Sequence, residues 1–127
     1  MRWLLLCLAL TACKKSPQPT LPMMDDMAKL PAGDNVETDQ SILFHTLVKY
    51  PGHASQVLGF YGPEMEKRGA ARQGDGFSDG NIEHVGGFGR DGSASVKDAA
   101  RPGIWMSVFE TAADTRVDIW ENVPKTR

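Results

Sequence analysis

The residues able to do acid–base or metal chemistry are widely scattered along this chain. The three histidines are His45, His53 and His84, and no two of them have the HxH or HExxH spacing of a metal site. The Gly-x-Ser-x-Gly pattern of a nucleophile elbow is also missing from the sequence. We therefore predict no catalytic residue and no metal site, and we expect each histidine to be a surface residue of a strand or of a helix start.

Two carboxylates near the end of the chain could line a sugar-like site beside Trp120. These are Asp118 and Glu121, three positions apart in a segment with strand periodicity. Because successive strand residues point to opposite faces of a sheet, the two carboxylates do not converge. The sequence therefore gives no catalytic pair, and we expect a protein that is not an enzyme.

Two glycine-rich segments match ligand-binding sequence motifs in residue type and spacing. Residues 87–92 read Gly-x-Gly-x-x-Gly, but Pro102 follows too soon for the helix of a dinucleotide site, so we predict a loop or bulged hairpin. Residues 75–80 have the look of a calcium loop, but Phe77 takes a ligand position and Gly86 stands where a bidentate glutamate is needed. No cofactor is expected.

The residues that precede Cys13 have the features of a signal peptide. Arg2 precedes an apolar run over residues 3–10, and the small residues 11–12 separate this run from the cysteine. A charged start, a short apolar stretch and small residues are the parts of a signal peptide. The stretch is about half the ~20 residues that span a bilayer, so it is too short for a transmembrane helix.

The sequence Leu10-Thr11-Ala12-Cys13 resembles the lipobox of bacterial lipoproteins. The resemblance implies that residues 1–12 are a signal peptide and that the Cys13 sulfur is acylated. It also implies a membrane partner through Cys13 and a place in the bacterial cell envelope, at the outer membrane facing the periplasm. The alternative is a plain secreted or uncleaved segment. Cleavage before Cys13 also removes Cys7, which leaves no thiol for a disulfide.

The charge balance argues against a nucleic-acid partner. Without Arg2 the chain has 13 basic and 16 acidic residues, and no basic stripe is visible. The 115 residues that follow the signal peptide are enough for one domain with a modest core.

Residues 13–40 are expected to be a lipidated, proline-rich tether. Three prolines between residues 17 and 22 favour an extended spacer. Residues 23–30 could make two helical turns whose methionines pack against the domain. We therefore predict a spacer, with this short helix, between the membrane and a globular domain over residues 41–127.

The first elements of that domain have clear periodicity. Residues 41–50 alternate with period two and are apolar on both faces, which predicts a strand inside a sheet. Residues 53–68 predict a helix that ends at Gly69 and is kinked or restarted at Pro63. Its apolar stripe consists of Val57, Leu58, Tyr61 and Met65.

Three short runs in this region carry a second resemblance. Tyr50-Pro51-Gly52, residues 57–61 and residues 65–69 resemble a pattern in small bacterial lipoproteins of unknown function, in which a strand ending in Tyr-Pro-Gly precedes a helix. The resemblance implies a strand–helix–strands domain on an envelope tether. It carries no catalytic residue over to this chain.

The end of the chain predicts a hairpin over residues 103–111 and 116–123. One face, containing Ile104, Met106, Val108, Val117, Ile119 and Val123, belongs to the core. The other face carries Trp105, Phe109 and Trp120. Either a helix or the Met23 segment covers these aromatics, or they form an interaction patch for an envelope protein, peptidoglycan or lipid.

The sequence as a whole predicts an α+β domain of two layers. We expect an antiparallel sheet of about four strands with one main helix packed on one face. The expected function is that of a membrane-anchored envelope lipoprotein that acts as a non-enzymatic binding or interaction module. The alternative is a small envelope enzyme or ligand carrier with a site in the glycine-rich region 74–92.

Overall fold

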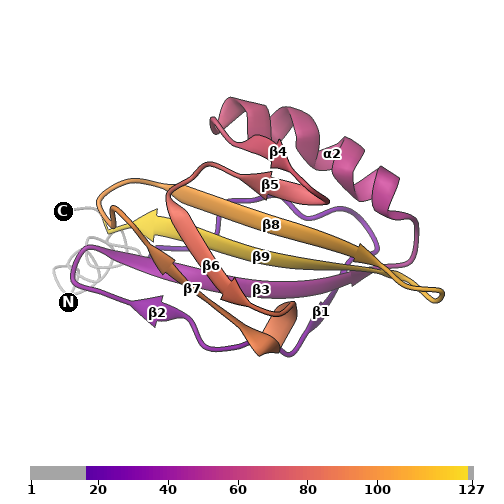
Figure 1. Cartoon of the computed structure of the whole chain (residues 1–127), viewed down its shortest axis with the longest axis horizontal. Coiled ribbons are helices and arrows are strands. Elements are labelled where there is room, and N and C mark those ends of the chain that lie inside the picture. Colours follow the sequence, from indigo (N-terminus) through magenta and orange to yellow (C-terminus); the bar gives the residue numbers. More distant parts are fainter. Residues whose placement is uncertain (1–16, 126–127) are drawn as a thin grey trace, which may run out of the picture.

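The computed structural model describes residues 17–125, which form a mixed α+β domain built around one large antiparallel sheet (Figure 1). Seven strands make this sheet, in the order β1-β3-β9-β8-β5-β4 with β2 also paired to β3. Their bounds are β1 Ala28–Leu30, β2 Val36–Glu37, β3 Ser41–Tyr50, β4 Ala71–Gln73, β5 Gly76–Ser78, β8 Gly103–Glu110 and β9 Thr115–Pro124. The expected sheet of about four strands was too small, because strands of two or three residues are too short to show a period.

The sheet is covered on both faces. The helix α2, Ala54–Lys67, packs on one face, and a separate hairpin of β6, Ile82–Gly86, and β7, Gly92–Val96, lies across the other (Figure 1). A short 3-10 helix, η1, spans Gly89–Asp91 between the two hairpin strands. The α+β class and the single main helix are confirmed, while the hairpin adds a third layer to the two that we expected.

Strand β3 confirms the prediction of an internal strand. It pairs with β9 along its whole length, from Ser41 opposite Pro124 to Tyr50 opposite Thr115, and its other edge pairs with β1 and β2. Its alternation sends Val48 into the core under the helix and Leu43 into a second core under the hairpin. A strand with both faces buried is apolar on both faces for this reason.

Helix α2 buries the predicted stripe. Val57, Tyr61 and Met65 are each 0% exposed. Pro63 lies inside one continuous helix, so it does not start a second one. At the end of the helix Gly69 adopts φ 77°, and the next amide, of Ala70, donates to Met65 O at 2.9 Å. This left-handed residue terminates the helix as the sequence predicts.

The terminal hairpin has the predicted faces, except that Val123 is only partly buried and lies outside the main core. Glu110 pairs with Thr115, and the main core contains Ile104, Met106, Val108, Val117 and Ile119 together with the helix stripe. The opposite face turns its aromatic side chains toward the β6–β7 hairpin.

The segment before β3 differs from its prediction. The expected helix over residues 23–30 is absent: a turn at residues 25–26 leads into β1, which pairs with the edge of β3. Strand pairing at a free sheet edge has outweighed a weak helical period. Leu21 is 6% exposed and part of the core, so the chain joins the domain well before residue 40.

The predictions for the signal peptide, Cys13 and its acylation concern residues outside the described range. Within residues 17–125, no helix is long and apolar enough to cross a membrane.

Candidate functional site

The carboxylate of Glu121 fixes the N-terminal segment to the sheet. Its side chain on β9 is 5% exposed and accepts hydrogen bonds from Thr20 N at 3.0 Å, Thr20 Oγ1 at 2.5 Å and Leu21 N at 3.3 Å. Arg68 Nη1, at the end of α2, completes the set at 3.3 Å. We call this arrangement the Glu121 junction. It ties together three segments that are distant in sequence.

The next contact along the chain strengthens the same attachment. Tyr61 Oη, on α2, donates to Pro22 O at 2.7 Å, and burial raises the pKa of Tyr61 to about 12. The phenol therefore stays protonated and keeps donating over the whole accessible pH range. Residues 20–22 are thus held by both β9 and α2.

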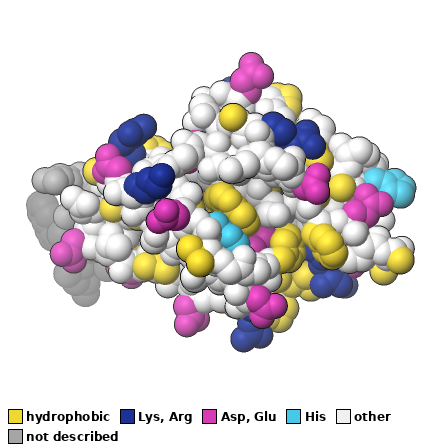
Figure 2. Space-filling view, viewed as in Figure 1, with side chains coloured by type: hydrophobic (Ala, Val, Ile, Leu, Met, Phe, Trp, Pro, Cys, Tyr) yellow, Lys and Arg dark blue, Asp and Glu magenta, His cyan; other side chains and the backbone are white. Residues whose placement is uncertain are grey.

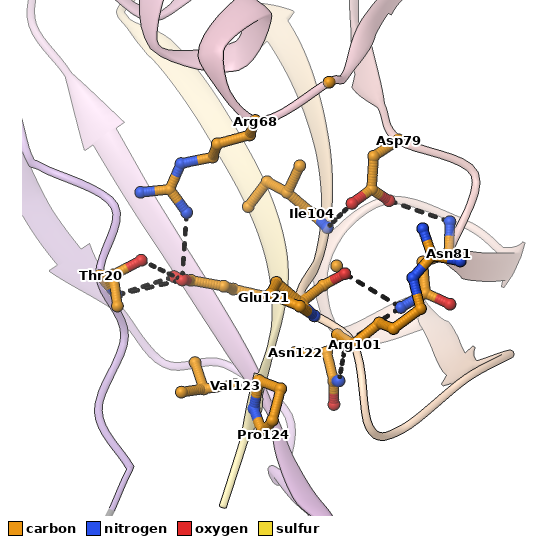
Figure 3. A pocket seen from close by; sticks show the side chains of 13 residues that line it. Thr20, Arg68, Asp79, Asn81, Arg101, Ile104, Glu121, Asn122, Val123 and Pro124 are labelled. Atoms are coloured by element: carbon orange, nitrogen blue, oxygen red, sulfur yellow. Dashed lines mark hydrogen bonds and ion pairs between the residues drawn. The ribbon is translucent and has the colours of Figure 1, made fainter. Parts of the chain in front are cut away.

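A cleft of about 480 Å³ opens beside the Glu121 junction (Figure 3). Arg68 lies on one wall and Arg101 on the opposite wall, with Glu121 between them (Figure 3). Its apolar lining consists of Pro102, Ile104, Val123 and Pro124. The volume falls in the range of about 300–1,000 Å³ that is usual for small-molecule sites.

Hydrogen bonds of Asn81 and Asp79 hold the wall that carries Arg101 in place. Asn81 Nδ2 donates to the carbonyl oxygens of Asp98, Arg101 and Pro102, each at 3.1 Å. Asp79 accepts from Asn81 N at 2.9 Å and from Ile104 N at 3.2 Å. Asn81 is only 8% exposed, so these bonds are shielded from water.

On the hairpin face, His45 and Asp118 form a fully buried pair. Their side chains are 0% exposed and His45 Nε2 lies 2.6 Å from Asp118 Oδ1. Gly33 N donates to His45 Nδ1 at 3.1 Å, which assigns the remaining proton to Nε2, and Gly89 N donates to Asp118 Oδ2 at 2.8 Å. The expectation that His45 lies on the surface was wrong. Every ring nitrogen and carboxylate oxygen of the pair is occupied, which favours a role in packing.

Two pairs of stacked rings lie on the same face of the sheet. His45 stacks on Trp120 with centroids 3.9 Å apart, and His84 of the hairpin stacks on Trp105 at the same distance. The two tryptophans are cross-strand partners on β8 and β9. His84 is only partly exposed, and burial lowers its pKa, an effect that the charge of Asp118 opposes.

The predicted aromatic patch is divided by the hairpin. Trp120 is 3% exposed and Phe109 is 57% exposed, with Phe88 of the hairpin loop 5.9 Å from the Phe109 ring. The covering element is the β6–β7 hairpin, neither a helix nor the Met23 segment. Figure 2 shows hydrophobic side chains still visible on this face, around the hairpin and toward the β8–β9 turn. Of the three predicted patch residues, Phe109 alone is largely exposed, and Trp105 is partly so.

The glycine-rich region forms two parts of the fold. Residues 76–78 are strand β5 and residues 87–92 close the β6–β7 hairpin. Within residues 17–125, no group of three or more His, Cys, Asp or Glu side chains is placed to hold a metal ion. The region does line a second pocket of about 460 Å³, together with Trp105, Ser107 and Lys97.

The third histidine lies where the sequence places it. His53 precedes the first turn of α2 with its side chain 76% exposed, and its Nδ1 is 3.0 Å from Glu110 Oε2. Glu110 Oε1 also accepts from Ala54 N at 2.8 Å. The hydrogen bond with His53 lowers the pKa of Glu110.

Sequence reasoning placed Asp118 and Glu121 on opposite faces, as the structure does, but it missed what each one binds. Thr20 and Glu121 are 101 positions apart, and no local pattern connects them. The one local sequence feature that pointed to part of the Glu121 junction was the i,i+4 spacing of Glu64 and Arg68, whose ion pair is 2.9 Å long.

No protein-family model, curated protein or solved structure matches this chain.

Proposed function

We propose that this protein is an acylated lipoprotein of the bacterial cell envelope, at the outer membrane facing the periplasm, and that its domain is a non-enzymatic binding module. The observation that carries the proposal is the lipobox-like sequence of residues 10–13, and the Glu121 junction limits how far the domain can lie from it. Thr20, the first residue of the junction, comes seven residues after Cys13. Seven extended residues reach at most about 25 Å.

That short reach changes the role of the tether. A spacer running from Cys13 to residue 40 would leave the domain free to move far from the bilayer. With residues 20–22 bound to Glu121 and Tyr61, an acylated Cys13 would hold the domain next to the membrane surface. Such a position suits a module that binds a lipid, or an envelope component that lies against the membrane.

The first experiment tests the anchor itself. Cells making the chain are labelled with radioactive palmitate and then fractionated. The Cys13→Ser variant should lose the label and leave the membrane fraction, whereas the matched Cys7→Ser variant, altered within the predicted signal peptide, should keep both. A Cys13→Ser protein that still fractionates with membranes would overturn the proposal.

The second experiment tests binding through the exposed part of the aromatic face. A photo-crosslinking amino acid replaces Phe109 in living cells, and a matched variant carries it at Phe60, which is 43% exposed on the helix. Adducts at position 109 but not at position 60 would locate a partner on the hairpin face. Equal or absent labelling at the two positions would remove support for this face.

A ligand carrier with its site in region 74–92 is a second candidate, favoured by the 460 Å³ pocket of Ser78, His84, Trp105 and Ser107. A bound molecule would be detected by native mass spectrometry of protein purified from the envelope. Ser107→Phe fills the pocket and should abolish the added mass, whereas Ser55→Phe on the exposed helix surface should not. An unliganded mass for the unaltered protein would count against the carrier.

A further inference from the structure

The cleft beside the Glu121 junction combines two arginines and two carboxylates with an apolar wall, and Thr20 of the N-terminal segment lines it. We propose that this cleft binds the phosphate headgroup of a membrane phospholipid together with the first part of its acyl region. This inference rests on the proposed function only for the source of the lipid. The recognition chemistry depends on the described residues alone.

The hydrogen-bonding state of the cleft favours an anion. Both carboxylates that line it are occupied: Glu121 accepts from Thr20, Leu21 and Arg68, and Asp79 accepts from two backbone amides. The two arginines and two carboxylates that line the cleft balance in formal charge, but N–H donors of the arginines remain unused. Among residues 17–125 the Arg101 guanidinium has no hydrogen-bond or ion-pair partner, and Arg68 uses only Nε and Nη1.

Two guanidinium groups on opposite walls suit a phosphate. Arginine presents planar pairs of N–H donors that match phosphate oxygens, and charge-assisted hydrogen bonds of this type are about twice as strong as neutral ones. Figure 3 shows Arg68 and Arg101 on either side of Glu121, with the Arg68 guanidinium directed toward Glu121 and Thr20. Since Arg68 is held by Glu64 and Glu121, its direction is fixed before any ligand enters.

The apolar lining argues for an amphiphile over a free phosphate ion. Val123 and Pro124 border the same cleft and are partly exposed, whereas Ile104 is only 1% exposed; a phosphate alone would leave the cleft largely unfilled. A volume of about 480 Å³ can take a headgroup and part of an acyl region. Thr20 lines the cleft and is seven residues from Cys13, so the bilayer that holds the anchor is within reach of the site.

The test measures binding of dihexanoyl phosphatidylglycerol, below its micelle concentration, to the chain from residue 13 onward with Cys13→Ser. This chain keeps all of residues 17–125 and needs no anchor, so a failure of acylation does not affect the result. Titration is followed by amide chemical shifts, which should change at Arg101, Ile104 and Val123. Absence of saturable binding would overturn the proposal.

Arg101→Gln should weaken this binding about ten-fold, because it removes one charge-assisted contact. The Arg101 side chain is exposed and its backbone carbonyl still accepts from Asn81 and Asn122, so the fold should be unaffected. Arg90→Gln, in the exposed hairpin loop, is the matched control and should bind as the unaltered chain does. Equal affinity of the Arg101 and Arg90 variants would place the lipid elsewhere and refute the site.

Inorganic phosphate distinguishes the two sources of the anion. The proposal expects phosphate to compete only weakly, at concentrations far above those of the lipid, since it makes no use of Ile104 and Val123. Phosphate that binds as tightly as dihexanoyl phosphatidylglycerol would show a free-anion site and overturn the assignment to a lipid.

Discussion

His45 and Asp118, 73 positions apart in sequence, are joined by a hydrogen bond of 2.6 Å beneath the β6–β7 hairpin. Asp118 also accepts from the amide of Gly89 in the hairpin loop, and His45 accepts from the amide of Gly33. One buried pair therefore connects the two central strands, the segment before β3 and the covering hairpin. A carboxylate in this position is stabilising only while all its donors remain in place.

Asp118→Asn should lower the stability of the fold. The amide group can accept from only one of the two donors and turns its own N–H groups toward the other, which leaves a buried donor unpaired. The expected loss is about 2–3 kcal/mol in the free energy of unfolding, measured by urea titration. Asp91→Asn, on the exposed surface of the hairpin loop, should change stability by less than about 0.5 kcal/mol. Equal stabilities for the two variants would contradict the role assigned to Asp118.

The parts of the fold that the sequence predicted are those with long local patterns. Ten residues of alternation defined β3, and four apolar residues at helical spacing defined the buried side of α2. The faces of the terminal hairpin followed from its alternation and short turn. In each case the chain segment itself carried the period of its structure.

The parts that were missed depend on contacts between distant segments. Strands β1, β2 and β4 have three, two and three residues, and each exists because an adjacent strand offers a free edge. A hairpin was one of the two forms predicted for residues 87–92, but its position over Trp120 was missed, because its glycines, which permit tight turns, also remove any hydrophobic period. The burial of His45 and the Glu121 junction were missed for the same reason, since their partners lie far away in sequence.

His84 should make the stability of the domain decrease in mildly acidic solution. Burial lowers its folded-state pKa below the ordinary 6.5, so the unfolded chain takes up the proton first as the pH falls. The stabilisation that neutral His84 contributes is therefore fully present above pH 6.5 and is lost as the pH falls through the folded-state pKa.

The variant His84→Phe keeps a ring against Trp105 and has no group to titrate. Its free energy of unfolding, measured by urea titration between about pH 7.5 and pH 5.5, should vary less than that of the unaltered protein. It should also be the more stable protein at neutral pH, because His84 Nε2 is buried without a partner. A pH dependence that is the same in both proteins would show that His84 does not titrate with folding.

The start of α2 should become less stable as the pH falls, because Glu110 is protonated. The hydrogen bond with His53 and the one from Ala54 N lower the pKa of Glu110 below its ordinary value of 4.5. The stabilisation of the helix start by ionised Glu110 is therefore present above pH 4.5 and is lost as the pH falls through the folded-state pKa. Hydrogen exchange at the Ala54 amide should therefore speed up in acid, after correction for intrinsic rates. In Glu110→Gln this exchange should depend little on pH. The matched Glu83→Gln, exposed on the hairpin, should behave as the unaltered chain does.

Two glycines should respond in opposite ways to the addition of one methyl group. A Cβ at Gly76 would overlap the backbone carbonyl oxygen of Met106 in the neighbouring strand, which cannot move without breaking the β5–β8 pairing. A Cβ at Gly59 meets no atom within 4 Å, and alanine there favours the helix. In urea titrations Gly76→Ala should lose about 1–3 kcal/mol and Gly59→Ala should gain about 0.5–1 kcal/mol. A Gly76→Ala protein of undiminished stability would show that β5 does not approach β8 as closely as the structure places it.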